Sequence, residues 1–234
     1  MRVVVYTALV GDIDYLWSVV PRRDDIQHVA FVDSPKQEIG LWGEEPPTIT
    51  SRAPAMVPTW EQRVIEPQWG NRRTARHVKT LAHRYLPDAD VWVWIDANVR
   101  PRMPSLALIG KYISGDLVTF DHWARRCLYD EAAVCIQQEK DRSGVLKPQV
   151  ERYRRAGMPR NWGLAATRIV IRRNTKAVRE LNETWWAEIE RGSVRDQVSL
   201  PFASWQSGLH WESLPGTCKP GNPDSRWLYL GHRA

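Results

Sequence analysis

Short apolar runs recur along the chain, and longer segments with helical periodicity separate them. The runs are rich in valine, isoleucine and tryptophan, which favour extended backbone. Strands are predicted at residues 2–6, 28–33, 60–66, 91–95, 117–122 and 166–172. Helices are predicted at residues 71–85, 147–156, 175–191 and 194–203, with a further helical region before a break at 141–144. Strands that alternate with helices indicate an α/β sandwich with a mostly parallel central sheet.

The segment 91–99, Val-Trp-Val-Trp-Ile-Asp-Ala-Asn-Val, is the most informative part of the chain. Its nearly continuous apolar run is typical of a strand buried on both faces of a sheet. Side chains at i and i+2 of an extended segment point the same way, so Asp96 and Asn98 could offer two oxygen ligands to one divalent cation. The alternative is that Asp96 only caps the turn before Arg100 and Pro101.

The predicted helix at 71–85 carries a basic stripe. Asn71 is a candidate N-cap, and Arg72, Arg76 and Lys79 follow at i, i+4 and i+7 of one face. Such a stripe could bind an anion, or it could be an ordinary solvated surface.

Length and composition favour one domain that spans residues 1–234. Residues 34–59 contain five prolines and are expected to form a loop excursion, since proline disrupts helix interiors. No apolar run approaches the roughly 20 residues of a membrane span, and the N-terminus lacks the layout of a signal peptide, so a cytoplasmic location is expected. The three cysteines have no C-x-x-C spacing, which argues against disulfides and against a cysteine-based zinc site.

The net charge of +6 and the sequence pI near 9.4 allow an anionic partner, which could be nucleic acid, an acidic membrane surface or a phosphorylated small molecule, and charge alone does not choose between them. A dinucleotide cofactor is not expected, because Gly11 stands alone after the first strand where that motif needs several glycines. Thirteen tryptophans suit stacking on sugars or bases, although most are expected to pack in the interior.

Four separate motifs resemble one known family. They are Asn71-Arg72-Arg73 with Arg76 and Lys79 before Trp94-Ile95-Asp96-Ala97-Asn98; the run His122 to Glu131, similar to His-x-x-Arg-x-Cys-x-Tyr-x-Glu; Glu151-Arg152-Tyr153-Arg154 through Asn161-Trp162-Gly163-Leu164; and Arg195-Asp196-Gln197-Val198-Ser199. Together they resemble a bacterial and plant family of GT-A-type glycosyltransferase domains from polysaccharide-synthesis loci and Golgi proteins. The resemblance covers residues 2–232. It implies a GT-A-like three-layer α/β/α sandwich, with the tail at 214–234 near the active site.

The resemblance implies a transferase that moves a sugar from a nucleotide-diphosphate sugar to a glycan, protein or other hydroxyl acceptor. Such domains neutralise the departing diphosphate with Mn²⁺ or Mg²⁺, which prefer oxygen ligands. Asp96 and Asn98 are the expected ligands here, with His232 as the third and His210 as the second candidate for that place.

The remaining site residues follow from the resemblance and from sheet topology. The residues expected to bind the donor are Thr7, Ala8, Gly11, Asp33, Arg72, Arg76, Lys79, Asp96, Arg125, Gly163 and Gln197. Asp196, Glu131 and His122 are the expected catalytic groups, because an inverting transferase needs a carboxylate to take the acceptor proton. A retaining enzyme would use the leaving phosphate instead, and the sequence does not distinguish the two. Glu131 could equally form a structural ion pair with Arg125, and Asp196 could cap a helix.

Two other classes of protein remain as alternatives. A nucleic-acid-binding or nucleic-acid-processing protein would fit the positive charge, but the chain has no recognisable reader motif, so stable nucleic-acid binding is not expected. A carbohydrate-binding module without catalysis would fit the tryptophans, but such sandwiches lack long helices.

Overall fold

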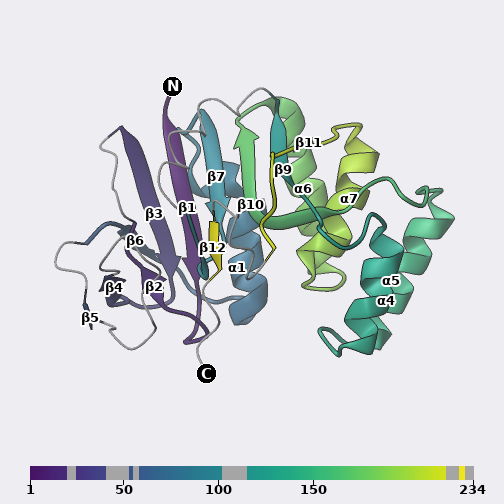
Figure 1. The fold of residues 1–234 in the computed structure, drawn as a ribbon, viewed down its shortest axis with the longest axis horizontal. Helices are drawn as coiled ribbons and strands as arrows, with labels where there is room; N and C mark the ends of the chain where they lie inside the picture. The colour runs from purple at the N-terminus through teal and green to yellow at the C-terminus, as the bar shows by residue number, and fades with distance from the viewer. Residues whose placement is uncertain (20–24, 41–52, 55–57, 102–114, 220–226, 230–234) are drawn as a thin grey trace.

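The computed structural model describes residues 1–19, 25–40, 53–54, 58–101, 115–219 and 227–229. A seven-stranded sheet runs through its centre (Figure 1). In spatial order its strands are β11 (Glu212–Ser213), β9 (Leu117–Asp121), β10 (Ala165–Arg173), β7 (Val91–Ile95), β1 (Val3–Leu9), β3 (Ile26–Val32) and β6 (Glu61–Val64). All neighbours are parallel except β10, which runs antiparallel to both β7 and β9. The predicted α/β class and mostly parallel sheet are therefore confirmed.

Helices cover one face of this sheet. They are α1 (Asn71–Thr80), α2 (Ala82–Tyr85), α6 (Lys176–Glu190) and α7 (Asp196–Ser207). Their apolar side chains form the largest core cluster with Trp92 and Trp94 of β7. Helices α4 (Leu128–Gln137) and α5 (Ser143–Arg155) pack with α7 around a separate cluster that contains Tyr153 and Phe202. The fold thus brings the starts of α1 and α7 and the end of α4 within reach of one sheet edge.

The opposite face is apolar as well. It contains Val5, Val93 and Ile171, and Trp60 and Leu214 pack over it from outside the central strands. Two small sheets complete the structure. One joins β2 (Leu16–Trp17), β4 (Glu38–Gly40) and β5 (Ala53–Pro54), and the other joins β8 (Val99–Pro101) and β12 (Trp227–Tyr229).

The boundaries of α1 and α2 correct two predictions. Asn71 is the first residue of α1 and not its N-cap; the cap position is Gly70, which has φ 75° and offers no side-chain hydrogen bond. The helix also breaks at Leu81 instead of running unbroken to Tyr85. Thr175, in contrast, caps α6 by accepting a hydrogen bond from the Val178 N–H, as the expected start near Asn174 suggested.

Three further expectations concern the cysteines, the loop excursion and membrane-spanning segments. The three cysteines are free and buried. Within the loop excursion at 34–59, β4 and β5 are the described strands, and residues 41–52 and 55–57 lie outside the described part. Among the helices of the described ranges, none is long and apolar enough to cross a membrane.

Candidate functional site

A cleft of about 640 Å³ opens where the carboxyl ends of β1 and β7 meet helices α1 and α7. This is the edge at which open α/β sheets bind their ligands. Its lining comes from six segments of the chain: Ala8–Val10 with Ile13 and Asp14; Asn71, Arg72, Ala75 and Arg76; Trp94 with Asp96–Asn98; Gln138–Lys140; Thr167–Arg168; and Val194–Gln197. Segments far apart in the sequence therefore form one site.

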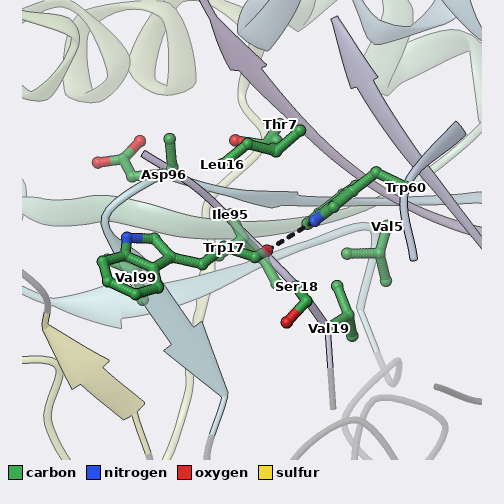
Figure 2. A pocket seen from close by; sticks show the side chains of 11 residues that line it. Val5, Thr7, Leu16, Trp17, Ser18, Val19, Trp60, Ile95, Asp96 and Val99 are labelled. Atoms are coloured by element: carbon green, nitrogen blue, oxygen red, sulfur yellow. Dashed lines mark hydrogen bonds between the residues drawn. The ribbon is translucent and has the colours of Figure 1, made fainter. Parts of the chain in front are cut away.

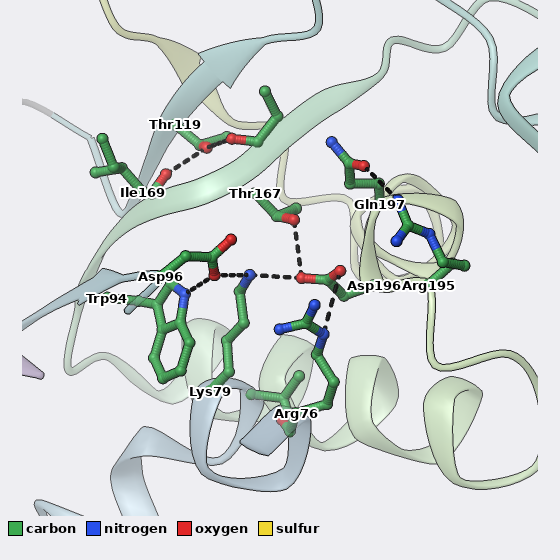
Figure 3. A network of polar contacts seen from close by, with 12 residues as sticks. Arg76, Lys79, Trp94, Asp96, Thr119, Thr167, Ile169, Arg195, Asp196 and Gln197 are labelled. Atoms are coloured by element: carbon green, nitrogen blue, oxygen red, sulfur yellow. Dashed lines mark hydrogen bonds and ion pairs between the residues drawn. The ribbon is translucent and has the colours of Figure 1, made fainter. Parts of the chain in front are cut away.

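A buried ammonium group holds the floor of the cleft together (Figure 3). The Lys79 side chain is 0% exposed, and its Nζ lies 3.2 Å from Asp96 Oδ1 and 2.5 Å from Asp196 Oδ2. The Trp94 indole N–H donates to the same Asp96 oxygen at 2.7 Å. Lys79 does not line the cleft, so the basic stripe predicted on the helix splits: Arg72 and Arg76 face the cleft, and Lys79 supports it from below.

Asp196 has both carboxylate oxygens occupied. Oδ2 accepts hydrogen bonds from Lys79 and from the Thr167 hydroxyl at 2.8 Å, and Oδ1 lies 3.4 Å from Arg76 Nε. Burial alone would raise the pKa of this carboxyl, but Arg76 and Lys79 outweigh burial and hold the pKa well below its usual range. Asp196 is therefore a fixed anion that orients two cations.

The lining of the cleft carries an excess of positive charge. The basic side chains on it are Arg72, Arg76, Lys140, Arg168 and Arg195, and the acidic ones are Asp14, Asp96, Glu139 and Asp196. Because Lys79 pairs with two of these acids from beneath the cleft, basic side chains in and below the cleft outnumber acidic ones. Arg72 is exposed and makes no ion pair within the described part of the chain, so its guanidinium is free to bind an anion.

An irregularity in β10 turns two residues toward the cleft. The pairing of β10 with β9 shifts register between Ala166 and Val170, which places Thr167 and Arg168 in a bulge. The Arg168 carbonyl accepts a hydrogen bond from the Asp96 N–H at 2.9 Å and so joins the bulge to the end of β7. Bulges often re-aim side chains next to functional sites.

The predicted geometry of Asp96 and Asn98 is wrong, although both residues line the cleft. Strand β7 ends at Ile95, and residues 96–99 form a turn closed by a 2.8 Å hydrogen bond from the Val99 N–H to the Asp96 carbonyl. The two side chains are thus brought to the cleft by a turn and not by alternation along a strand.

The residues expected to hold a metal fit one only in part. Asp96 Oδ1 is taken by Lys79 and Trp94, while Oδ2 accepts no hydrogen bond within the described part of the chain. No group of three His, Cys, Asp or Glu residues suited to a metal occurs among the described residues. His232 lies outside them, and strand β12 places the nearby Tyr229 beside Val99. Asp96 and Asn98 can therefore supply two oxygen ligands, which is fewer than a divalent cation takes, so further ligands are needed to complete the site.

His210, the second candidate for the third ligand, lies away from the cleft lining. Its two ring nitrogens face the main-chain carbonyls of Trp211 at 2.9 Å and Trp162 at 3.2 Å. The ring also stacks on Trp211. These contacts give His210 a structural role.

Four of the residues expected to bind the donor follow the first two strands of the sequence, namely Thr7, Ala8, Gly11 and Asp33, and of these only Ala8 lines the cleft. Asp33 accepts a 2.9 Å hydrogen bond from the Gly11 N–H and pairs with Lys36 Nζ at 2.9 Å. Burial would raise the pKa of Asp33, but these partners lower it overall. Gly11 has φ 78° and lies against Asn71, so it shapes the loop after β1.

Thr7 lines a second, small cavity of about 20 Å³ beside Asp96, together with Leu16 and Trp60 (Figure 2). Its hydroxyl is buried and has no hydrogen-bond partner within the described ranges. A cavity of this size holds about one water molecule and not a base.

The motif around His122 forms a separate buried cluster. Arg125 Nε donates to Glu131 Oε2 at 2.5 Å, and the His122 Nδ1 accepts from the Ala124 and Arg125 N–H groups at 3.2 Å. Burial lowers the pKa of His122 to about 4, so the ring is neutral at pH 7. None of these three side chains lines the cleft, and the structural ion pair weighed for Glu131 and Arg125 is present.

Gly163 also lies outside the cleft lining. Its φ is 129°, and a Cβ at this position would lie 2.8 Å from the Trp211 ring. Its glycine is therefore required by backbone conformation and close packing.

Several cleft residues were not predicted from the sequence: Asp14, Glu139, Lys140, Thr167, Arg168 and Arg195. Arg195 precedes the Asp196-Gln197 pair and could have been found there. Arg168 interrupts an apolar strand, which was a usable signal. Glu139 and Lys140 follow a helix end with no motif, and only the fold brings them here.

Comparison with known families agrees with this geometry. The family described as "TOD1/MUCI70, glycosyltransferase-like domain" matches residues 1–212. The chain belongs to the TOD1/MUCI70 glycosyltransferase-like family. The matched range of this TOD1/MUCI70-like chain includes every described residue of the cleft. A comparison with curated proteins finds no significant relative.

Proposed function

We propose that this TOD1/MUCI70-like protein transfers a sugar from a nucleotide-diphosphate sugar to a hydroxyl group of a glycan, protein or other acceptor. One observation supports this most: the cleft at the carboxyl edge of the sheet gathers guanidinium groups from three separate elements around Asp96 and Asp196. Guanidinium groups bind phosphate oxygens through paired hydrogen bonds. A diphosphate is the anion that such an arrangement suits.

The residues in and below the cleft have two proposed roles: some bind the donor, and others hold those residues in position. In this proposal Arg72, Arg168 and Arg195, which line the cleft, bind the diphosphate and stabilise charge as it develops on the leaving group. Asp196 and Lys79 hold Arg76 and Asp96 in position beneath the donor. Because these groups are fixed before the donor binds, little reorganisation accompanies the reaction.

We further propose that Asp96 and Asn98 hold a divalent cation, with Asp96 Oδ2 as the open carboxylate oxygen. Mn²⁺ or Mg²⁺ would act as a Lewis acid on the leaving phosphate. His232 remains the predicted third ligand. The cytoplasmic location also stays a prediction.

Thermal unfolding with nucleotides tests the proposed function. UDP, GDP and TDP are added separately at about 100 times their dissociation constants, with Mn²⁺ or with EDTA. One of them should raise the melting temperature by roughly 5 °C or more, because a ligand that binds only the folded state stabilises it by about 2.7 kcal/mol at that concentration. Asp96→Ala should remove the Mn²⁺-dependent part of the shift.

A matched pair of arginine variants separates cleft binding from general charge. Arg72→Gln should weaken the nucleotide shift, whereas Arg155→Gln, at a side chain 79% exposed on α5, should not. Stabilisation by oligonucleotides and by no nucleotide diphosphate would refute the transferase. If the nucleotide raises the melting temperature equally with Mn²⁺ and with EDTA, only the proposed metal site is refuted.

A further inference from the structure

The acids of the cleft differ in how they are engaged. Asp196 is held by Lys79, Thr167 and Arg76, and Asp96 by Lys79 and Trp94. Asp14 also has an interaction partner. Glu139 is different: it is exposed, it lines the cleft, and its carboxylate has no hydrogen bond or ion pair within the described part of the chain.

Glu139 has an unusual backbone conformation. Its φ is 50°, in the left-handed region that favours glycine. It occupies the position after the last helical turn of α4, where the Lys140 N–H donates to the Cys135 carbonyl at 2.9 Å and the Glu139 N–H to the Ile136 carbonyl at 3.1 Å. Glycine is usual at this position of the motif. A glutamate here is a conformational cost that a role for its side chain would explain.

The position of Glu139 is fixed relative to Asp196. Two residues along, Asp141 Oδ2 accepts hydrogen bonds from the Ser193 hydroxyl at 2.5 Å and the Val194 N–H at 3.2 Å. This clamp joins the end of α4 to the segment that enters α7, so that Gln138–Lys140 and Val194–Gln197 line the same cleft. The backbone at Glu139 is thereby tied to the segment that enters α7, and its carboxylate, unpaired among the described residues, borders the cleft that the donor is proposed to occupy.

We propose that Glu139 is the base that accepts the proton of the acceptor hydroxyl; this rests on the proposed function. The acceptor oxygen bonds to the anomeric carbon of the sugar as its proton moves to the Glu139 carboxylate. The bond from that carbon to the diphosphate oxygen breaks, and the diphosphate leaves with the electron pair. Direct displacement of this kind inverts the anomeric configuration.

Asp196, the carboxylate predicted from the sequence for this role, is poorly suited to it. Its two oxygens already face Lys79, Thr167 and Arg76. A carboxylate stabilised this strongly as an anion has little affinity for a further proton. Glu139 is free of such partners.

Donor cleavage by water and by azide tests the assignment. Release of the nucleoside diphosphate is measured with UDP-glucose, UDP-N-acetylglucosamine, GDP-mannose and TDP-glucose, in buffer alone and with sodium azide. Water must lose a proton to react, whereas azide is already an anion. Glu139→Gln should therefore slow cleavage by water about 100-fold or more and leave cleavage by azide near the wild-type rate. The glycosyl azide should have the inverted configuration.

Controls separate this inference from the proposed function. Glu180→Gln, at a side chain 64% exposed on α6, should behave as wild type in both reactions. If nucleotide binds but Glu139→Gln cleaves with water normally, or loses both reactions equally, Glu139 is not the base. A wild type that binds donors and cleaves none with either nucleophile also contradicts the assignment. If no nucleotide diphosphate binds, the proposed function fails and this inference fails with it.

Discussion

Lys79 is the residue whose role changes most between sequence and structure. Its place in a basic stripe suggested contact with phosphate, yet its ammonium lies buried between Asp96 and Asp196. A buried ion pair costs desolvation energy, and removing one partner leaves the other charges uncompensated. Lys79 therefore organises the cleft without lining it.

Replacing Lys79 should therefore strongly destabilise the folded protein. Lys79→Met is expected to lower the free energy of unfolding by about 3–5 kcal/mol, because two carboxylates lose their shared cation. Urea denaturation measures the change. Lys176→Met, at a side chain 92% exposed, should alter stability by roughly 0.5 kcal/mol or less. A small effect of Lys79→Met would show that the acids find other partners.

The helices and strands around the cleft contribute residues to its lining mainly from their ends. The end of α4, the start of α7, the start of α1 and the bulge in β10 each supply short pieces of the lining. The strands and helices behind them are apolar and tightly buried, so the ends are held in fixed positions. Variation of function within such a fold is expected at these ends.

The conformation at the end of α4 gives a prediction about stability. Glu139→Gly should raise the free energy of unfolding by about 1 kcal/mol, since glycine adopts a positive φ without the steric cost of a Cβ. Urea denaturation measures the gain. Asn161→Gly, at the other described non-glycine residue with positive φ, should gain less, because asparagine tolerates this conformation. No gain in Glu139→Gly would mean that its side chain stabilises the fold.

Charge is the property of the whole molecule that bears most on function. The net charge is +6, and the cleft has more basic than acidic side chains around it. A concave site with a surplus of one sign of charge attracts ligands of the opposite sign. The positive net charge of the molecule thus favours the binding of an anionic ligand in the cleft.

This field predicts a dependence on salt. The affinity for the nucleotide diphosphate that stabilises the protein should fall roughly tenfold between 50 and 500 mM NaCl, as ions screen the cleft. Titration calorimetry at constant Mn²⁺ measures it. Arg72→Gln should bind more weakly and show a shallower dependence, and Arg155→Gln should match wild type. An affinity independent of salt would argue against charge as the main source of binding.

The order of strands and helices could be read from the chain, because apolar periodicity is local and survives without tertiary contacts. The sheet strands β7, β9 and β10 and helix α6 lie close to their predicted ranges. The motifs around Arg72, Asp96 and Asp196 were also found, since each occupies a few neighbouring positions.

Which of these residues meet, and which are buried, depended on packing across the whole chain. Lys79 and Asp196 are 117 positions apart, and no local pattern states that they touch. Asp33, Glu131 and Arg125 have suitable side chains, but Asp33 pairs with Lys36 and Glu131 pairs with Arg125, and none of the three lines the cleft. Glu139 has no motif at all and reaches the cleft because Asp141 ties its loop to Val194. The sequence determines which side chains are available. Long-range contacts determine where those side chains lie and which charged groups surround them.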